Sequence, residues 1–242
     1  LLEDTWKSVT IGKFSINEFL EFLPIYKSER DPNIWAYISG IISSMSKILP
    51  IESNESFVKY FNQLIHSIKN DLGKEIRDSD SMEVKELRAI INKLIGTIEN
   101  EKSFVNFYSS KFQDGTIEEI EDGSLYNTTL YISALDPEIK IEQFLEKFLN
   151  AGSPQIEGRY RAILGIVRDP NAGKVIVQSM LNGTIRGADC PYILASMIAN
   201  KVTGKDSWNE IKDNYSDLLG VMPEWTASVS YTHLRAHETL DH

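Results

Sequence analysis

Apolar residues recur at intervals of three and four along most of this 242-residue chain, and the polar breaks between successive runs are short. This spacing places the apolar side chains on one face of an α-helix, whereas the alternation expected of strands is almost absent. The clearest run begins at Pro32, which follows Asp31 as a plausible helix cap. It then carries one apolar stripe before Pro50, made of Trp35, Ile38, Ile41, Ile42, Met45 and Leu49. The pattern predicts a helix over residues 32–49.

Further helices are predicted along the chain, each about 10 to 18 residues long with a short connection to the next. The next stripe runs from Phe57 to Ile68 and closes at Gly73, a residue suited to a helix end. Later runs cover residues 84–98, 103–112, 124–135, 138–150, 154–167, 171–182, 189–200 and 205–219. Short connections are typical of antiparallel helix pairs. We therefore expect an all-α fold, an irregular α-solenoid of antiparallel HEAT-like helix pairs that is truncated at both ends. The alternative is a compact, irregular helical domain.

Length, charge and cysteine usage limit the class of protein. A chain of 242 residues suits one globular domain or two small ones. Lysine and arginine total 25 against 35 acidic residues, a formal charge of -10, so we expect no nucleic acid partner, because binding one needs a basic face. No stretch reaches the roughly 20 apolar residues that cross a bilayer, so we expect no membrane partner. The single cysteine, Cys190, cannot form an internal disulfide, and we predict a cytoplasmic location.

The last residues depart from the helical pattern. Residues 229–239 lack a sustained apolar face and read like the translation of a transposase adapter used in sequencing libraries. We therefore predict a helical domain over residues 1–228 and a non-native tail over residues 229–242. The tail carries three of the four histidines, His233, His237 and His242. His237-Glu238 imitates the start of the zinc-peptidase motif H-E-x-x-H, but His242 comes one residue too late to share its helix face, so we assign no metal there.

Outside the tail, no group of residues has the spacing of a catalytic or metal site. His66 stands on an apolar helix without neighbouring residues of ligand type. Cys190 has no histidine nearby in sequence, so we interpret it as a buried structural thiol rather than a nucleophile. The acidic residues of segment 118–122 lack the spacing of a calcium loop and are interpreted as a solvated face. We predict no catalytic residue and no metal ligand in this chain.

The carboxyl-terminal half carries short motifs in a characteristic order. They are Arg159-Tyr160-Arg161 with Leu164, Arg168-Asp169-Pro170, Ile185-Arg186 with Asp189, Pro191-Tyr192, Asn200, Gly204, Trp208 and the segment 212–215. Their order and spacing resemble the carboxyl-terminal helical domain of the aminopeptidase N and puromycin-sensitive aminopeptidase family of zinc metallopeptidases. The opening, Leu1-Leu2-Glu3-Asp4 with Gly12, is similar to that family's leucine-rich acidic helix. The resemblance covers residues 1–228 and departs at Ala188, Lys201 and Tyr215, where the family usually has glutamine, proline and tryptophan.

The resemblance implies both an architecture and a function. In this family the helical domain is a bowl of HEAT-like helix pairs that covers the active site, while a separate catalytic domain holds zinc and the H-E-x-x-H motif. We therefore expect a cap domain that is inactive alone, with zinc in the missing catalytic domain. Its partners would be the catalytic domain of the same polypeptide and a peptide substrate. The alternative is a free-standing α-solenoid adaptor that binds a protein or peptide in its concave groove.

Cationic side chains on such a concave surface could receive the free carboxylate of a peptide. Arg186 is the first candidate, followed by Arg159 and Arg161. The competing interpretation is that all three arginines form helix-end or interhelical salt bridges.

Overall fold

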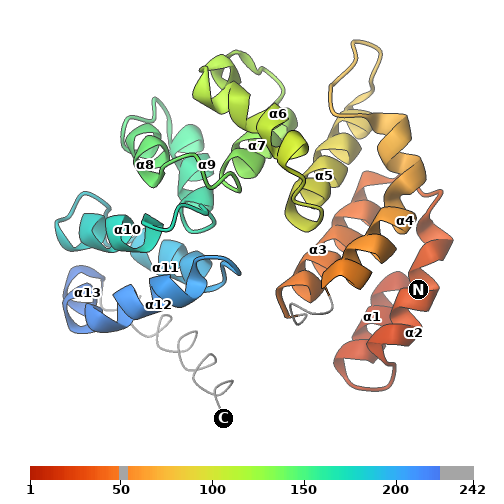
Figure 1. Ribbon diagram of the computed structural model, residues 1–242, viewed down its shortest axis with the longest axis horizontal. Helices are drawn as coiled ribbons and strands as arrows, with labels where there is room; N and C mark the ends of the chain where they lie inside the picture. Colours follow the sequence, from red (N-terminus) through yellow and green to blue (C-terminus); the bar gives the residue numbers. More distant parts are fainter. Residues whose placement is uncertain (49–53, 224–242) are drawn as a thin grey trace. The chain divides into compact units, whose positions relative to one another are not determined.

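The computed structural model describes residues 1–48 and 54–223 (Figure 1). Within these ranges every regular element is a helix, which confirms the predicted all-α fold class. The chain divides into two compact units, one from Leu1 to Asn100 and one from Glu101 onward. Each unit buries its own set of apolar side chains.

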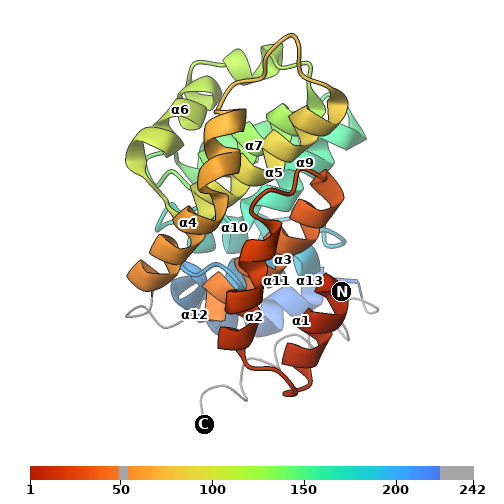
Figure 2. The same ribbon diagram turned by 90° about the vertical axis from the view of Figure 1, so that its right-hand side faces the viewer.

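In the first unit, helix α5 packs against both α3 and α4. The apolar stripes predicted from the sequence meet there, so that Trp35 of α3, Phe61 of α4 and Ile91 of α5 are all fully buried. Helices α1 and α2 lie at the end of this unit that is farther from α5 (Figure 2). The elements are α1 (Leu2–Thr10), α2 (Ile16–Phe22), the 3-10 helix η1 (Leu23–Tyr26), α3 (Pro32–Ile48), α4 (Asn54–Leu72) and α5 (Met82–Ile98).

Local sequence signals explain the helix boundaries of the first unit. Helix α2 begins with a capping box, in which the Ser15 hydroxyl accepts the Glu18 N–H and the Glu18 carboxylate accepts the Ser15 N–H at 2.7 Å. The carboxylate of Asp31 accepts the Asn33 N–H at 2.7 Å, which confirms Asp31 as the cap of α3. Helix α4 ends at Gly73 with φ +68°, as the predicted closing glycine requires. The predicted end of α3 at Pro50 lies outside the described residues.

The second unit is a succession of stacked helix pairs. Helix α6 pairs with α7, and α8 pairs with α9; helix α9 also contacts α7 and α11, while α10 contacts α8, α12 and α13. Figure 1 shows these pairs side by side along the chain. Stacking of each pair on its neighbours is the arrangement of a solenoid, as predicted. The elements are α6 (Lys102–Gln113), the 3-10 helix η3 (Thr116–Glu119), α7 (Gly123–Ser133), α8 (Ile141–Leu149), α9 (Pro154–Leu164), α10 (Ala172–Leu181), α11 (Cys190–Ile198), α12 (Gly204–Asp213) and α13 (Tyr215–Val221).

Two differences between the predicted helices of this unit and the structure have a clear local cause. The run over 205–219 is wrong as a single helix, because α12 ends at Asp213 and α13 begins at Tyr215. Between them the Asn214 amide donates to the Glu210 carbonyl at 2.8 Å, a side-chain bond that competes with helix continuation. The run over 138–150 is helical only from Ile141, because the carboxylate of Asp169 accepts the Ile141 N–H at 3.1 Å and fixes the helix start.

Candidate functional site

Two of the three candidate arginines belong to one ion-pair network that joins α9 to the turn between α10 and α11. The Arg186 guanidinium donates from Nε to the Asp189 carboxylate at 3.0 Å, and it also pairs with Glu157. Arg161 donates from Nη1 to the other carboxylate oxygen of Asp189 at 2.7 Å. Asp189 is the buried centre of this network, with a side chain 5% exposed. The hydrogen bond to Asp189 and the negative charge of Asp189 raise the pKa of Arg186. The Arg186 side chain is therefore charged, and it already has ion-pair partners.

The third candidate, Arg159, has different surroundings. Its guanidinium lies over the ring of Tyr126, with 4.8 Å between the guanidinium carbon and the ring centroid. No carboxylate pairs with Arg159 among the residues that the structure describes. A guanidinium that stacks on an aromatic face keeps the N–H groups at its edge available for a carboxylate. Of the three candidates, Arg186 is paired twice, whereas Arg159 has no carboxylate partner among the described residues.

The support beneath Arg159 is aromatic and buried. The hydroxyls of Tyr126 and Tyr160 lie 3.2 Å apart, and both side chains are almost fully buried. Burial raises the pKa of Tyr160, and its hydrogen bond to Tyr126 adds to this effect, so Tyr160 stays neutral. The ring beneath Arg159 is thus held in place by burial and by its contact with Tyr160.

The sequence analysis did not identify one exposed aromatic side chain near this network as a candidate site residue. Tyr192 of α11 is 64% exposed, and the Arg161 guanidinium carbon lies 6.0 Å from its ring centroid. Tyr192 was singled out only as part of a family motif. The spacing of Arg186 and Asp189, three residues apart, was the local signal that could have predicted their pairing. No sequence signal identifies Tyr126 as the platform for Arg159, because the two residues come from different helices.

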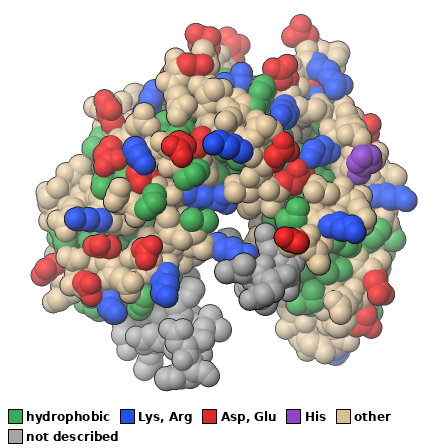
Figure 3. Space-filling view, in the orientation of Figure 1, with side chains coloured by type: hydrophobic (Ala, Val, Ile, Leu, Met, Phe, Trp, Pro, Cys, Tyr) green, Lys and Arg blue, Asp and Glu red, His purple; other side chains and the backbone are tan. Residues whose placement is uncertain are grey.

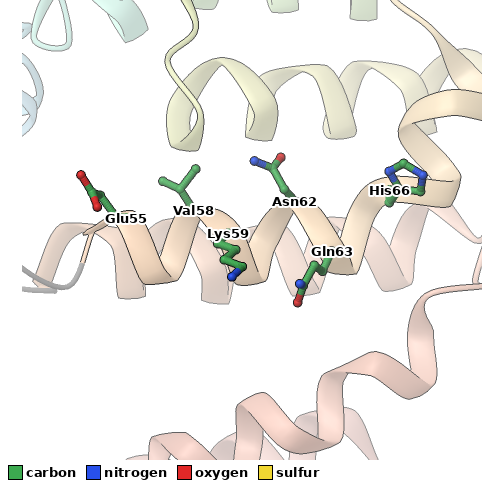
Figure 4. A pocket seen from close by; sticks show the side chains of 6 residues that line it. All are labelled: Glu55, Val58, Lys59, Asn62, Gln63 and His66. Atoms are coloured by element: carbon green, nitrogen blue, oxygen red, sulfur yellow. The ribbon is translucent and has the colours of Figure 1, made fainter.

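The exposed face of α4 carries the lone histidine of the described ranges. Figure 4 shows its neighbours along the helix, where the side chains of Glu55, Val58, Lys59, Asn62, Gln63 and His66 line a hollow of about 550 Å³. His66 is exposed, and its Nε2 atom lies 3.3 Å from the Asn70 amide. In residues 1–48 and 54–223, no three histidine, cysteine, aspartate or glutamate side chains converge to hold a metal ion.

The remaining residues singled out in the sequence have structural roles. Cys190 is buried, and burial raises the pKa of its thiol to about 11, which confirms the interpretation as a structural thiol. In the acidic segment, Glu118 pairs with Lys147 at 2.7 Å, and the Asp122 carboxylate caps α7 by accepting the Leu125 N–H at 2.8 Å. His233, His237 and His242 lie outside the described residues.

The space-filling view shows how charge is distributed on one face of the molecule. On the face seen in Figure 3, acidic and basic side chains are interspersed. Among the described residues, no helix combines the length and apolar character that a membrane crossing requires.

The fold is a succession of stacked helix pairs, and α9 carries two of the three candidate arginines. The chain belongs to the ERAP1-like C-terminal domain family, whose model matches residues 1–235. The predicted domain boundary at residue 228 falls inside this match, and the predicted non-native tail, residues 229–242, lies outside the described residues and stays a prediction.

A curated relative of this chain is named as an aminopeptidase. The chain is 21% identical over 221 residues to "Aminopeptidase 2, mitochondrial" of Saccharomyces cerevisiae. The aligned region covers 88% of this chain but only 23% of that relative. The chain thus spans less than a quarter of the length of this relative.

Proposed function

We propose that this chain is the helical cap domain of a zinc aminopeptidase, which closes over the active site and shapes the cavity for the peptide substrate. The observation that carries the proposal is the family match over residues 1–235, and a relative named as an aminopeptidase supports it. A stack of HEAT-like helix pairs presents a continuous surface that can enclose a peptide and exclude water. The catalytic domain of the same polypeptide would be its partner.

The described side chains do not fit zinc. Three protein ligands are usual in a catalytic zinc site, whereas His66 is exposed and no converging set accompanies it in the described ranges. We therefore assign no catalytic step to this chain and place zinc in the catalytic domain. On this proposal the chain alone is inactive.

Within the cap, Arg159 is the strongest candidate to bind the carboxylate of a peptide. Its edge N–H groups are free of carboxylate partners in the described residues, while Tyr126 holds the guanidinium plane. Arg186 and Arg161 would first have to release Asp189. In the complete enzyme, Arg159→Gln should raise KM for peptides with a free carboxyl end. It should leave KM unchanged for peptides of the same sequence whose carboxyl end is amidated. Equal effects on both peptides would assign Arg159 a purely structural role.

The first experiment compares this chain with the longer polypeptide encoded around it. Both are purified, supplied with zinc and assayed with aminoacyl coumarin substrates. We expect activity only in the longer polypeptide. Activity of the chain alone would refute the cap proposal. An upstream reading frame without a zinc site would favour the free-standing adaptor that binds a protein or peptide.

We also propose a cytoplasmic location, in keeping with the single buried thiol of the chain. The name of the yeast relative places that protein in mitochondria. Cell fractionation followed by immunoblotting distinguishes the two compartments.

A further inference from the structure

A second hollow, of about 610 Å³, lies in the second unit where the α6/α7 pair meets the α8/α9 pair. Its lining comes from the end of α6, from η3, from α8 and from the beginning of α9. None of the three candidate arginines lines it, and it shares Tyr160 with the support beneath Arg159.

The lining combines buried aromatic rings with a rim on which an ion pair joins α8 to η3. Phe112 and Tyr160 are its most buried apolar members, at 5% and 1% exposed. Phe112 stacks on Phe144 of α8, with the ring centroids 4.4 Å apart, which fixes the spacing of the two helix pairs. At the rim, Lys147 of α8 pairs with Glu118 of η3 at 2.7 Å. The hollow is therefore held open by packed elements on both sides.

The rim carries more negative than positive charge. Asp114, Glu118 and Glu146 line the hollow together with one cation, Lys147, which Glu118 already neutralises. The Thr116 N–H and hydroxyl donate to Asp114 and lower its pKa, so Asp114 is ionised at neutral pH. Glu146 has no ion-pair partner among the described residues. A cationic ligand is complementary to such a rim, whereas an anionic one would meet repulsion.

We propose that this hollow docks a basic peptide segment of a partner protein, with a lysine or arginine side chain at Asp114 and Glu146 and an adjacent apolar side chain against the Phe112 side of the hollow. This interaction is independent of the proposed cap function. Charge complementarity supplies orientation and association rate, and the walls of the hollow, polar and apolar together, supply contact area.

The test uses two blocked peptides, so that neither can act as an aminopeptidase substrate. The probe is N-acetyl-Lys-Phe-Arg-Leu-Lys-amide, and its counterpart is N-acetyl-Glu-Phe-Asp-Leu-Glu-amide. Binding to the whole chain is measured by titration calorimetry at low and at physiological salt. We expect the basic peptide to bind at least tenfold more tightly than the acidic one, with an affinity that falls as salt rises. Equal binding of both peptides, or no binding of the basic one, would overturn the proposal.

Two pairs of variants separate the hollow from general acidity of the surface. Gly152 lies at the rim, and a Cβ atom added there meets nothing within 4 Å, so Gly152→Trp should place an indole ring over the hollow. We expect at least a tenfold loss of affinity, with no change for Gly220→Trp, another open position outside the hollow. Glu146→Gln should weaken binding about threefold, and Glu142→Gln on the same helix should not. If Gly152→Trp binds the basic peptide like the unmodified chain, the site is not the hollow.

Discussion

A buried ion pair in the first unit gives the sharpest prediction about stability. Arg88 of α5 is 1% exposed, and its Nη1 atom lies 2.7 Å from the Asp80 carboxylate, whose side chain is 7% exposed. Arg88 also donates from Nε to the Leu72 carbonyl at 3.0 Å. One guanidinium therefore binds the carbonyl of the last residue of α4 and the Asp80 carboxylate in the connection between α4 and α5.

The perturbation is Arg88→Met, which keeps a long apolar stem and removes the guanidinium. Asp80 would lose its buried guanidinium partner and keep only the Arg77 N–H bond at 2.6 Å and the more distant charge of Arg77. The Leu72 carbonyl would keep only the 3.4 Å bond from Arg77. Removing one partner of a buried pair costs about 3–5 kcal/mol, a large share of the 5–15 kcal/mol that stabilise a typical domain. We therefore expect the first unit to lose about 4 kcal/mol of unfolding free energy.

Native-state hydrogen exchange in urea measures this loss on the amides of α4 and α5. The matched control is Lys7→Met, which removes an exposed cation paired with Glu3 and should leave the same amides unchanged. Replacing both partners, as in Asp80→Leu with Arg88→Met, should recover part of the loss, because no unpaired charge remains. A loss below about 1 kcal/mol, the range of exposed pairs, would refute the reasoning. So would a double variant no more stable than Arg88→Met alone.

Three further predictions concern packing and ionisation. Gly165→Ala should destabilise the second unit by about 1–3 kcal/mol, because the added Cβ would lie 2.5 Å from the Ser196 Cβ. Gly158→Ala on the same helix meets nothing nearer than 4.0 Å and should not lower Tm in a thermal scan. The Cys190 thiol, with its pKa raised to about 11, should react with Ellman's reagent at pH 8 only after denaturation, and rapid labelling of the folded chain would contradict its burial. Burial raises the pKa of Tyr60 to about 12, and its hydroxyl donates to the Leu20 carbonyl at 2.6 Å, so its contribution to stability is complete below pH 10 and is lost as pH rises through 12. Tyr60→Phe should remove this alkaline loss in urea unfolding at pH 9 to 12, and an unchanged profile would show that another group is responsible.

Periodicity predicted most of the helices because a buried helix face needs apolar residues at its own period. Asp31 and Gly73 marked boundaries that the structure confirms, since capping depends only on residues within one turn. Helix α2 was not predicted as a separate element, although Ser15 and Glu18 carry a capping box. The break at Asn214 was missed because its side-chain bond to Glu210 competes with a pattern that continues on both sides.

The sequence by itself determined the helical class, the structural role of Cys190 and the three arginines worth inspecting. Only the tertiary structure decided which of the three arginines has no carboxylate partner in residues 1–48 and 54–223. Asp189 lies 28 residues from Arg161, and Tyr126 comes from another helix than Arg159, so neither contact follows from local spacing. The hollow between the two helix pairs likewise depends on side chains from four elements. Local periodicity determines which face of a helix is buried, but the partner that covers it is set by how successive pairs stack.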